Sequence, residues 1–559
     1  MIVALLFFGF FLLVTLPFGW AVLRWLGCDD LPPLPWLSLT GLAVLIALAA
    51  ALSLVWSLDF RPWLLILPLA GGLWWQWLRR EPFPRLSLAW GWPLLALALL
   101  SVLQNALAPA ANSDTGLYHA QAIRWIETQP VVPGLGNLHA RLAFNSNWYV
   151  GGALFSFAFL RPSAQLSLHL LPGALFALFV WEMGRGLRLT SLADALRLLL
   201  LPAAFYTLGS EISSPGTDLP VTLLTWLLAV LWLDMYAPGR RFPRRAGQLL
   251  LILLPVFAVT LKLSALPLLL FSLSELLRLA WQRAVRPLLA LLPVGLLLLL
   301  PWLARSVILS GYPFFPQTAF NWFGPDWKLP LEEALFRQGE IIAWARLPGE
   351  PTQAVLAMPL RVWALRWLAE LTRNQRLLVG AAALSPLLVL GLTPWLRTLR
   401  STWLLIAFAG AGLAFWFFSA PALRFGYGWL MLLALLPVAA VLAQVQAFLR
   451  RLDQLRPKRR RWLLLALRSL PLFLLIGLMA YQSFFLARSF DAAQLRSTWL
   501  LPAPYPSLPT EPCTLADGTR LWQAQQYLQC WYEPFPCVPV CPDDVVQRQN
   551  GRGFRPLTP

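Results

Sequence analysis

The residues best suited to chemistry lie in a polar loop at 109–164, directly after a long apolar stretch. Ser113 or Asp114 can cap a helix that runs to about Thr128, which places the Asp114 carboxylate at a helix N-terminus. Tyr118 follows one turn later on the same face, and His119 is adjacent to it. A carboxylate in this position can accept the proton of an acceptor hydroxyl, as a general base. The alternative is that Asp114 only caps the helix.

The same loop continues with turn residues and further hydrogen-bonding side chains. Among these, His139, Arg141 and Asn145 are candidates for substrate contacts, together with Tyr118 and His119. Two of the three His residues of the chain lie in this loop. A single His is more often structural, so the prediction of an acceptor pocket comes from the density of polar groups rather than from either His alone.

Five other positions add charge near the ends of apolar segments. Asp218 is a second acidic candidate and Glu211 a weaker one. Lys262 interrupts an apolar stretch, where an ionisable residue is a functional candidate, although it could also snorkel to the interface. Arg305 and Arg424 stand at the ends of two later segments. Cations such as Lys262, Arg305 and Arg424 can hold a lipid phosphate and stabilise it as it leaves.

The composition indicates the class of protein that positions these residues. Of the 559 residues, 58% are hydrophobic and 12% are charged, whereas soluble domains average about 25% charged residues. A soluble enzyme, a disordered chain and a disulfide-dense secreted scaffold are therefore excluded. The net charge of +19 comes from short basic runs between apolar segments, which argues against nucleic-acid binding and is typical of cytoplasmic loops.

The apolar segments predict an all-α polytopic membrane protein with about 14 helices (12–14). Spans are expected near 1–21, 37–57, 62–78, 87–108, 165–182, 193–208, 218–236, 287–304, 376–393, 401–419, 425–446 and 462–487, with 247–277 forming a hairpin broken at Lys262. The first segment lacks a basic start and a cleavage site, so we expect it to be retained. The expected units are an N-terminal transmembrane unit (1–108), a first outer loop (109–164), central helices (165–304), a large outer loop (305–375), C-terminal helices (376–487) and an outer module (488–559).

The basic loops predict the orientation of the chain. If the loops at 79–85, 185–188, 240–245, 278–286, 397–400 and 450–461 are cytoplasmic, the loops at 109–164, 209–217, 305–375 and 420–424 face outward, as do both termini. This topology requires residues 148–161 to lie along the outer surface without crossing. The expected location is a bacterial inner membrane.

The cysteines agree with this orientation. Four of the five cysteines lie in the tail: Cys513, Cys530, Cys537 and Cys541. An outward tail is an oxidising setting, so two disulfides are expected, with three connectivities open. A four-thiolate metal site is the weaker alternative. We expect Cys28 to be an apolar filler on the cytoplasmic side.

This plan resembles the GT-C superfamily of integral-membrane glycosyltransferases. The resemblance implies a catalytic acid in the first long outer loop, matched by Asp114, followed by a surface-lying helix, matched by residues 148–161. It also implies a second acid, matched by Asp218 or less well by Glu211, and basic positions matched by Lys262 and Arg424. The chain departs from the pattern because four spans precede the first long loop, which has a single Asp. It has no Asp-x-Asp motif in the outer loops, so no obligatory metal and no other cofactor is expected.

More narrowly, the segments SDTGLYHAQAIRWIE, PGLGNLHARLAFNSNW, SGYPFFP and RFGYG look like an uncharacterised family of bacterial multi-spanning proteins. That resemblance covers roughly residues 1–440 and implies membership without supplying a reaction.

The leading hypothesis is a glycosyltransferase that uses a polyprenyl-phosphate-linked sugar and acts on a glycan, lipid or protein acceptor at the outer face of the bilayer. A polysaccharide polymerase or ligase of the cell envelope is the first alternative. A transporter predicts mid-span charges and related halves, whereas the sequence has few central charges and no evident internal repeat. A non-catalytic assembly factor also stays open.

Overall fold

A computed structural model describes residues 2–81, 92–160, 166–236, 242–396, 400–451, 505–549 and 551–557, with some further residues within 469–481 and at 502–503. Most of these residues are helical. The N-terminal half forms α1 (Ile2–Trp25), α2 (Leu34–Leu52), α3 (Arg61–Arg80), α4 (Trp92–Leu107), α5 (Ala120–Thr128), α6 (Leu135–Leu138), α7 (Asn147–Leu154), α8 (Leu166–Met183), α9 (Leu192–Leu208), α10 (Asp218–Tyr236), α11 (Arg244–Leu261) and α12 (Leu269–Trp281).

The second half continues with α13 (Val285–Ser310), α14 (Leu331–Arg346), α15 (Thr352–Ala357), α16 (Leu360–Glu370), α17 (Arg373–Leu396), α18 (Arg400–Ser419) and α19 (Leu423–Arg451). Five short turns of helix join these elements, η1 (Thr115–His119), η2 (Ala140–Ala143), η3 (Gly184–Arg188), η4 (Gly209–Ser213) and η5 (Leu263–Leu268), of which η1 is a π-helical turn.

Within the described residues, 11 helical segments are long and apolar enough to cross a membrane. The expected count of about 14 helices is wrong in two ways. The total number of helices is larger, because the outer segments are themselves helical. The number that qualifies as spans is smaller, because α3 contains Gln, Gly and Trp residues and the apolar part of α4 (Leu95–Leu107) is short. The expected span at 462–487 lies outside the described residues, apart from isolated positions.

The hairpin predicted around Lys262 is present as two antiparallel candidate spans. The helix α11 ends at Leu261, Lys262 adopts an extended backbone, and η5 leads into α12. No candidate span lies within 148–160, the described part of the segment predicted at 148–161, but the helix in it does not lie on the surface either. Its helix α7 is buried, with Trp148 1% exposed, and packs against α2 and α5.

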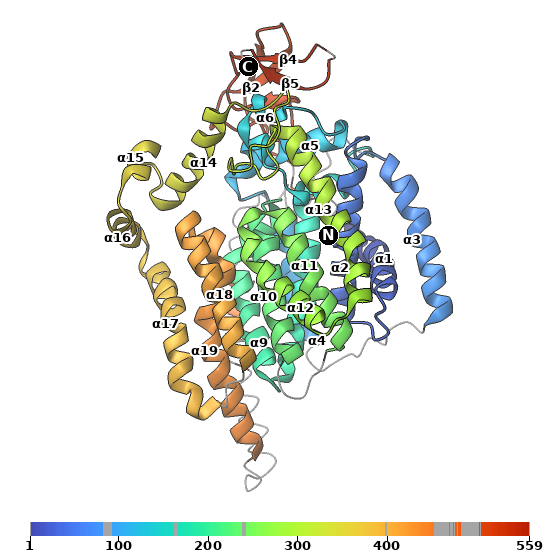
Figure 1. The fold of residues 1–559 in the computed structure, drawn as a ribbon, viewed down its shortest axis with the longest axis vertical. Helices are drawn as coiled ribbons and strands as arrows, with labels where there is room; N and C mark the ends of the chain where they lie inside the picture. Colours follow the sequence, from blue (N-terminus) through green and yellow to red (C-terminus); the bar gives the residue numbers. More distant parts are fainter. Residues whose placement is uncertain are drawn as a thin grey trace.

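The arginine-rich segments meet at one end of the helical bundle. Arg24 near the end of α1 pairs with Glu81 after α3, and Arg245 at the start of α11 donates to the Leu26 carbonyl at 3.0 Å. The indole of Trp232 near the end of α10 donates to the Ser401 carbonyl at the start of α18 at 2.9 Å. This is the lower end in Figure 1, opposite the C-terminal strands.

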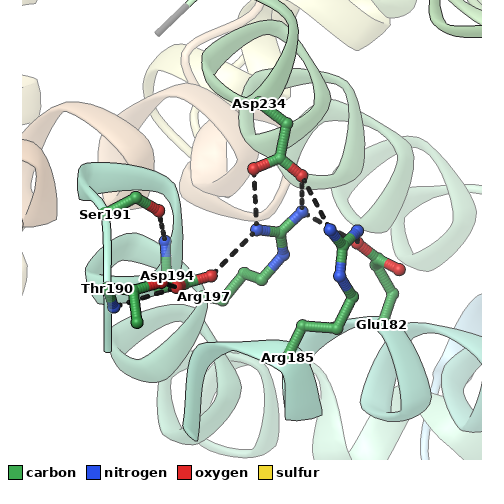
Figure 2. A network of polar contacts seen from close by, with 7 residues as sticks. All are labelled: Glu182, Arg185, Thr190, Ser191, Asp194, Arg197 and Asp234. Carbon is green, nitrogen blue, oxygen red and sulfur yellow. Dashed lines mark hydrogen bonds and ion pairs between the residues drawn. The ribbon is translucent and has the colours of Figure 1, made fainter. Parts of the chain in front are cut away.

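At this basic end lies a buried ionic network, drawn in Figure 2 and here called the Arg197 network, made of Glu182, Arg185, Asp194, Arg197 and Asp234. The Arg197 side chain is 0% exposed, and its guanidinium lies 2.8 Å from Glu182 and 2.5 Å from Asp234. Arg185 adds a second cation 2.7 Å from Glu182. Because the carboxylates come from α8, α9 and α10, the network ties the ends of three spans together.

The C-terminal module, residues 505–557, caps the opposite end of the molecule, at the top of Figure 1. Strands β1 (Thr510–Thr514) and β2 (Arg520–Ala524) pair antiparallel, β3 (Cys537–Val538) joins β2 in parallel, and β4 (Val545–Gln547) pairs with β5 (Phe554–Pro556). The disulfides Cys513–Cys541 and Cys530–Cys537 close this small unit, which confirms the two expected bonds and fixes their connectivity.

Candidate functional site

The predicted outer loops all gather at the end of the bundle that carries the C-terminal module. Asn112 connects the first two of them, because its backbone N–H donates to Ser214 Oγ at 3.2 Å and its side-chain amide donates to Glu211 Oε2 at 3.0 Å. The Asn112 Oδ1 atom in turn accepts from the backbone N–H of Asp114 at 2.9 Å. Asn112 therefore fixes the backbone of Asp114 and leaves its carboxylate available.

The Asp114 carboxylate does not cap the helix that follows. It accepts no backbone hydrogen bond at the start of η1. Instead, one of its oxygens lies 2.9 Å from Nη2 of Arg424, in the first turn of α19. The capping role considered from the sequence is thus replaced by an ion pair between distant segments.

Four charged side chains form one group, here called the Asp114 cluster: Asp114, Asp218, Lys262 and Arg424. Arg424 Nε lies 3.7 Å from Asp218 Oδ2, and the Lys262 ammonium is paired with the other oxygen of Asp218. The four side chains are between 12% and 34% exposed, so they are partly buried and still reachable from outside. The structure thus brings together the two acidic candidates Asp114 and Asp218 with two of the three candidate phosphate contacts, Lys262 and Arg424.

Lys262 owes its position to the break between α11 and η5. The hydroxyl of Ser146, which caps α7, donates to the Leu261 carbonyl at 2.7 Å and holds the chain just before Lys262. The Lys262 Nζ then lies 3.8 Å from the ring centroid of Phe425, the neighbour of Arg424. Phe425 thus packs against both cations, since the Arg424 guanidinium carbon is 5.2 Å from the same ring.

The charges around Asp114 keep its carboxyl ionised. Burial alone would raise the pKa of Asp114, but His119, Arg424 and Arg141 act in the opposite direction and the net pKa is lowered. Burial lowers the pKa of His119 to about 4, so His119 is neutral at neutral pH. Arg424 is therefore the neighbour that keeps Asp114 charged under physiological conditions.

A buried tyrosine, Tyr149, and a partly buried one, Tyr118, line the inner side of the same loop. The ring centroids of Tyr118 and Tyr149 are 6.4 Å apart, and the ring of Tyr149 lies 5.2 Å from that of His119. Burial and the nearby Asp114 raise the pKa of Tyr118 above its usual range, so its phenol stays protonated. Tyr118, Tyr149 and His119 thus form a neutral polar layer next to Asp114.

His139 and Arg141 belong to a second region of the same end. Both line a cavity of about 640 Å³ between the first outer loop, α14 and the C-terminal module. Leu117, which lines the same cavity, follows Asp114 by one helical turn, so the cavity adjoins the turn that carries Asp114.

Arg305 and Asn145 do not join the Asp114 cluster. Arg305 is 2% exposed and donates to Ser53 Oγ at 2.5 Å. Asn145 and Trp302 hydrogen-bond reciprocally, at 2.6 Å and 2.9 Å, between the first loop and α13. Both residues fix α13 against neighbouring segments rather than facing the cluster.

The C-terminal module contacts the Asp114 loop directly. The backbone N–H groups of Cys530 and Trp531 both donate to the Gly116 carbonyl at 2.9 Å, two residues after Asp114. Gln121 of α5 donates to the Trp531 carbonyl at 2.9 Å and accepts from the Cys537 N–H at 3.1 Å. The module therefore holds the outer side of the turn that carries Asp114.

Some of these residues were not predicted from the sequence. The Arg197 network could have been found, because Glu182, Arg197 and Asp234 are ionisable residues near the ends of predicted spans. The contact between Gly116 and Trp531 joins segments 415 residues apart and leaves no local signal. Among the described residues, no group of three or more His, Cys, Asp or Glu side chains is arranged to hold a metal ion.

Comparison with known proteins gives a family but no reaction. No curated protein and no solved structure matches the chain. A family model described as a domain of unknown function (DUF8201) matches residues 1–431, which include the whole Asp114 cluster and stop before the C-terminal module. The chain belongs to this family, the DUF8201 family.

Proposed function

We propose that the protein is a membrane glycosyltransferase that transfers a sugar from a polyprenyl-phosphate-linked donor to an acceptor hydroxyl at the outer face of the bacterial inner membrane. The observation that carries this proposal is the convergence of Asp114, Asp218, Lys262 and Arg424 from four separate segments. A carboxylate next to paired cations at a membrane surface suits a reaction in which an acceptor loses a proton while a phosphate leaves.

In this reaction the acceptor oxygen attacks the anomeric carbon of the donor sugar. The bond from that carbon to the phosphate oxygen breaks, and its electron pair stays on the lipid phosphate. The acceptor proton passes to the Asp114 carboxylate. Lys262 and Arg424 stabilise the additional negative charge on the phosphate through charge-assisted hydrogen bonds.

The resting ion pairs suggest how donor binding prepares Asp114. Arg424 is shared between Asp114 and Asp218 before any phosphate is present. A phosphate competes for the same guanidinium, so Asp114 loses part of its counter-charge when the donor binds. Its pKa then rises, and the carboxylate becomes a stronger base at the moment when it is needed.

The proposed orientation follows from the arginines. The Asp114 cluster lies at the end opposite the segments of Arg24, Arg245 and Arg278, and clustered basic residues mark cytoplasmic ends. The cluster then faces away from the cytosol, where lipid-linked donors present their sugars. Two disulfides in the module at the same end agree with an oxidising side.

The test uses the full chain in lipid nanodiscs with a panel of polyprenyl-phosphate-linked sugars, and it measures release of polyprenyl phosphate. Replacing Asp114 by Asn is expected to lower the rate about 10²–10⁴-fold without weakening donor binding, because a general base contributes about that much. Replacing Asp30, an exposed acid at the opposite end, by Asn is the matched control and keeps full activity. Full activity of the Asp114→Asn variant, or no turnover of any donor by the native chain, overturns the proposal.

A further inference from the structure

The cavity of about 640 Å³ has a size typical of ligand pockets, which span about 300–1,000 Å³. Three segments far apart in sequence form its walls. The first outer loop contributes Leu117 and residues around His139, the helix α14 contributes its first turns, and the C-terminal module contributes Val540, Asp544 and their neighbours. The module wall lies beyond the part of the chain that the family model matches.

The charges in the walls are unusual for such a basic chain. The lining carries four carboxylates, of Glu332, Glu333, Glu340 and Asp544, against two guanidinium groups, of Arg141 and Arg337. The net charge of the whole protein is +19, so the net charge of the cavity lining is opposite in sign to that of the protein. An anionic ligand is disfavoured here, in contrast to the Asp114 cluster, where cations are available for a phosphate.

Part of this polar lining has no partner in the part of the chain that the structure describes. Arg337 is paired with Glu333 at 2.7 Å and with Glu340 at 3.0 Å. Among the described residues, Glu332 and Asp544 form no ion pair, and Arg141 has only a 3.9 Å contact with Glu340. Nδ1 of His139 is buried without a hydrogen-bond partner. Unused acceptors and donors of this kind suit the hydroxyl groups of a ligand.

An aromatic ring completes the arrangement. Phe336 of α14 lines the cavity and remains 48% exposed. The C–H face of a pyranose ring packs well on an aromatic side chain, while its hydroxyls donate to carboxylates. An exposed ring beside unpaired carboxylates therefore favours a carbohydrate over a purely apolar molecule.

We infer that this cavity binds an uncharged or cationic oligosaccharide, and that the C-terminal module helps to select it. Its role as the acceptor site rests on the proposed function, because Leu117 of the cavity wall follows Asp114 by one helical turn and Arg141 lies within electrostatic reach of the same carboxylate. The binding itself does not depend on transfer chemistry. Donor and acceptor would thus occupy two neighbouring regions, one with balanced charges and one with a net negative charge.

The test measures binding of three probes of equal length to the full chain in nanodiscs by calorimetry. The probes are the trimers of N-acetylglucosamine (uncharged), glucosamine (cationic) and galacturonic acid (anionic). The first two are expected to bind, and the cationic trimer about threefold to tenfold more tightly at low ionic strength than at high ionic strength. Binding only of the anionic trimer, or of none, overturns the inference.

Two variants locate the binding. Phe336→Ala is expected to weaken the uncharged trimer about tenfold, because the ring contact is lost. Glu332→Gln is expected to weaken the cationic trimer several-fold and to leave the uncharged trimer nearly unchanged. Glu332 is exposed, so this variant folds even if Phe336→Ala does not. Glu370→Gln, an exposed acid of α16 outside the cavity, is the matched control.

Asp114→Asn separates this inference from the proposed function. The variant is expected to bind the trimers as the native chain does. If the trimers bind but no donor is turned over, the transferase proposal fails and the binding site stands. If a donor is turned over while Phe336→Ala and Glu332→Gln leave all trimer affinities unchanged, the cavity assignment fails and the transferase proposal stands.

Discussion

The Arg424 guanidinium lies 2.9 Å from the Asp114 carboxylate, although 310 residues separate the two positions in sequence. The same guanidinium is 3.7 Å from Asp218. Arg424 thus stands between the carboxylates of Asp114 and Asp218. Without Arg424, Lys262 would be the remaining cation of the cluster. The pair joins the first outer loop to α19 and makes the charge state of Asp114 dependent on a residue from the other half of the chain.

The first prediction concerns Arg424→Gln, which removes this cation. The pKa of Asp114 is expected to rise, because burial raises it and the main permanent charge opposing burial is gone. Infrared difference spectra taken across an acid pH range report the protonation of the carboxyl, and the Asp114→Asn background identifies its band. Arg366→Gln, which removes an exposed pair with Glu350, is the control and leaves the band unchanged. A titration identical to that of the native chain would contradict the coupling.

The second prediction concerns the contact between the C-terminal module and the Asp114 turn. A Cβ atom on Gly116 would lie 2.6 Å from the Trp531 ring, so Gly116→Ala must displace that ring. We expect a loss of about 1–3 kcal/mol in the docking of the module and faster amide hydrogen exchange over residues 113–119. Adding Trp531→Ala should restore slow exchange in part by making room for the methyl group.

Gly71→Ala provides the matched control for this substitution. Gly71 lies within α3, and a Cβ atom there would meet nothing within 4 Å. The amide hydrogen exchange of the Gly71→Ala variant over residues 113–119 should equal that of the native chain. If Gly116→Ala behaves in the same way as Gly71→Ala, the module does not support the Asp114 turn.

The lengths of the apolar segments and the positions of the arginines indicate which loops share one side of the membrane. This is why the sequence could place the residues of the Asp114 cluster on the same side. Lys262 was found for the same reason, as a charge that interrupts an apolar run. Arg305 shows the limit of this reasoning. It is a cation near a span end, as expected, but its side chain donates to Ser53, the residue that follows α2, and does not face the cluster. Which face of a span a residue occupies depends on packing between helices, and nearly uniform apolar sequences contain little information about that.

The buried position of α7 illustrates the same limit. Its sequence is short and contains Gly151 and Gly152, which excluded a crossing, yet nothing local distinguishes a surface helix from one enclosed by α2 and α5. The contact of the C-terminal module with the Asp114 turn could not be predicted from the sequence either. Its disulfides follow from cysteine content and sidedness, whereas its contacts with Gly116 and Gln121 depend on how two separate units fit together.

The third prediction concerns the Arg197 network at the basic end. Arg197→Met leaves Glu182 and Asp234 with only Arg185 as a partner, in surroundings where the Arg197 side chain is 0% exposed. Breaking a buried pair on one side costs about 3–5 kcal/mol, so we expect a large fall in thermal stability in detergent. Adding Glu182→Gln and Asp234→Asn to Arg197→Met should recover much of the loss, since the remaining uncompensated charge is reduced.

The partly exposed pair of Arg337 and Glu333 on α14 supplies the comparison for this network. Their side chains are 24% and 38% exposed, and such pairs contribute about 0–1 kcal/mol. Arg337→Met should therefore change the unfolding temperature little. Equal losses from Arg197→Met and Arg337→Met would mean that the buried network does not stabilise the bundle.

The final prediction concerns pH and the docking of the C-terminal module on α5. Glu127 is 5% exposed, and its carboxylate lies 2.5 Å from the hydroxyl of Tyr532 in the module. Burial raises the pKa of Glu127 to about 7, against smaller opposing effects of Tyr532, Ser156 and Arg124. An exposed glutamate has a pKa near 4.3, so the docked state binds the proton more tightly than the undocked state.

The sign of the pH effect follows from this difference. Below about pH 4 Glu127 is protonated in both states, and its full contribution to docking is present. As the pH rises towards 7, only the undocked state ionises, so docking weakens by an amount on the order of 3 kcal/mol and then levels off. Hydrogen exchange of the module measured across this range should accelerate with pH beyond the intrinsic chemical rate. Glu127→Gln keeps a polar side chain that cannot ionise and should remove this excess; if the excess persists in the variant, another group controls docking.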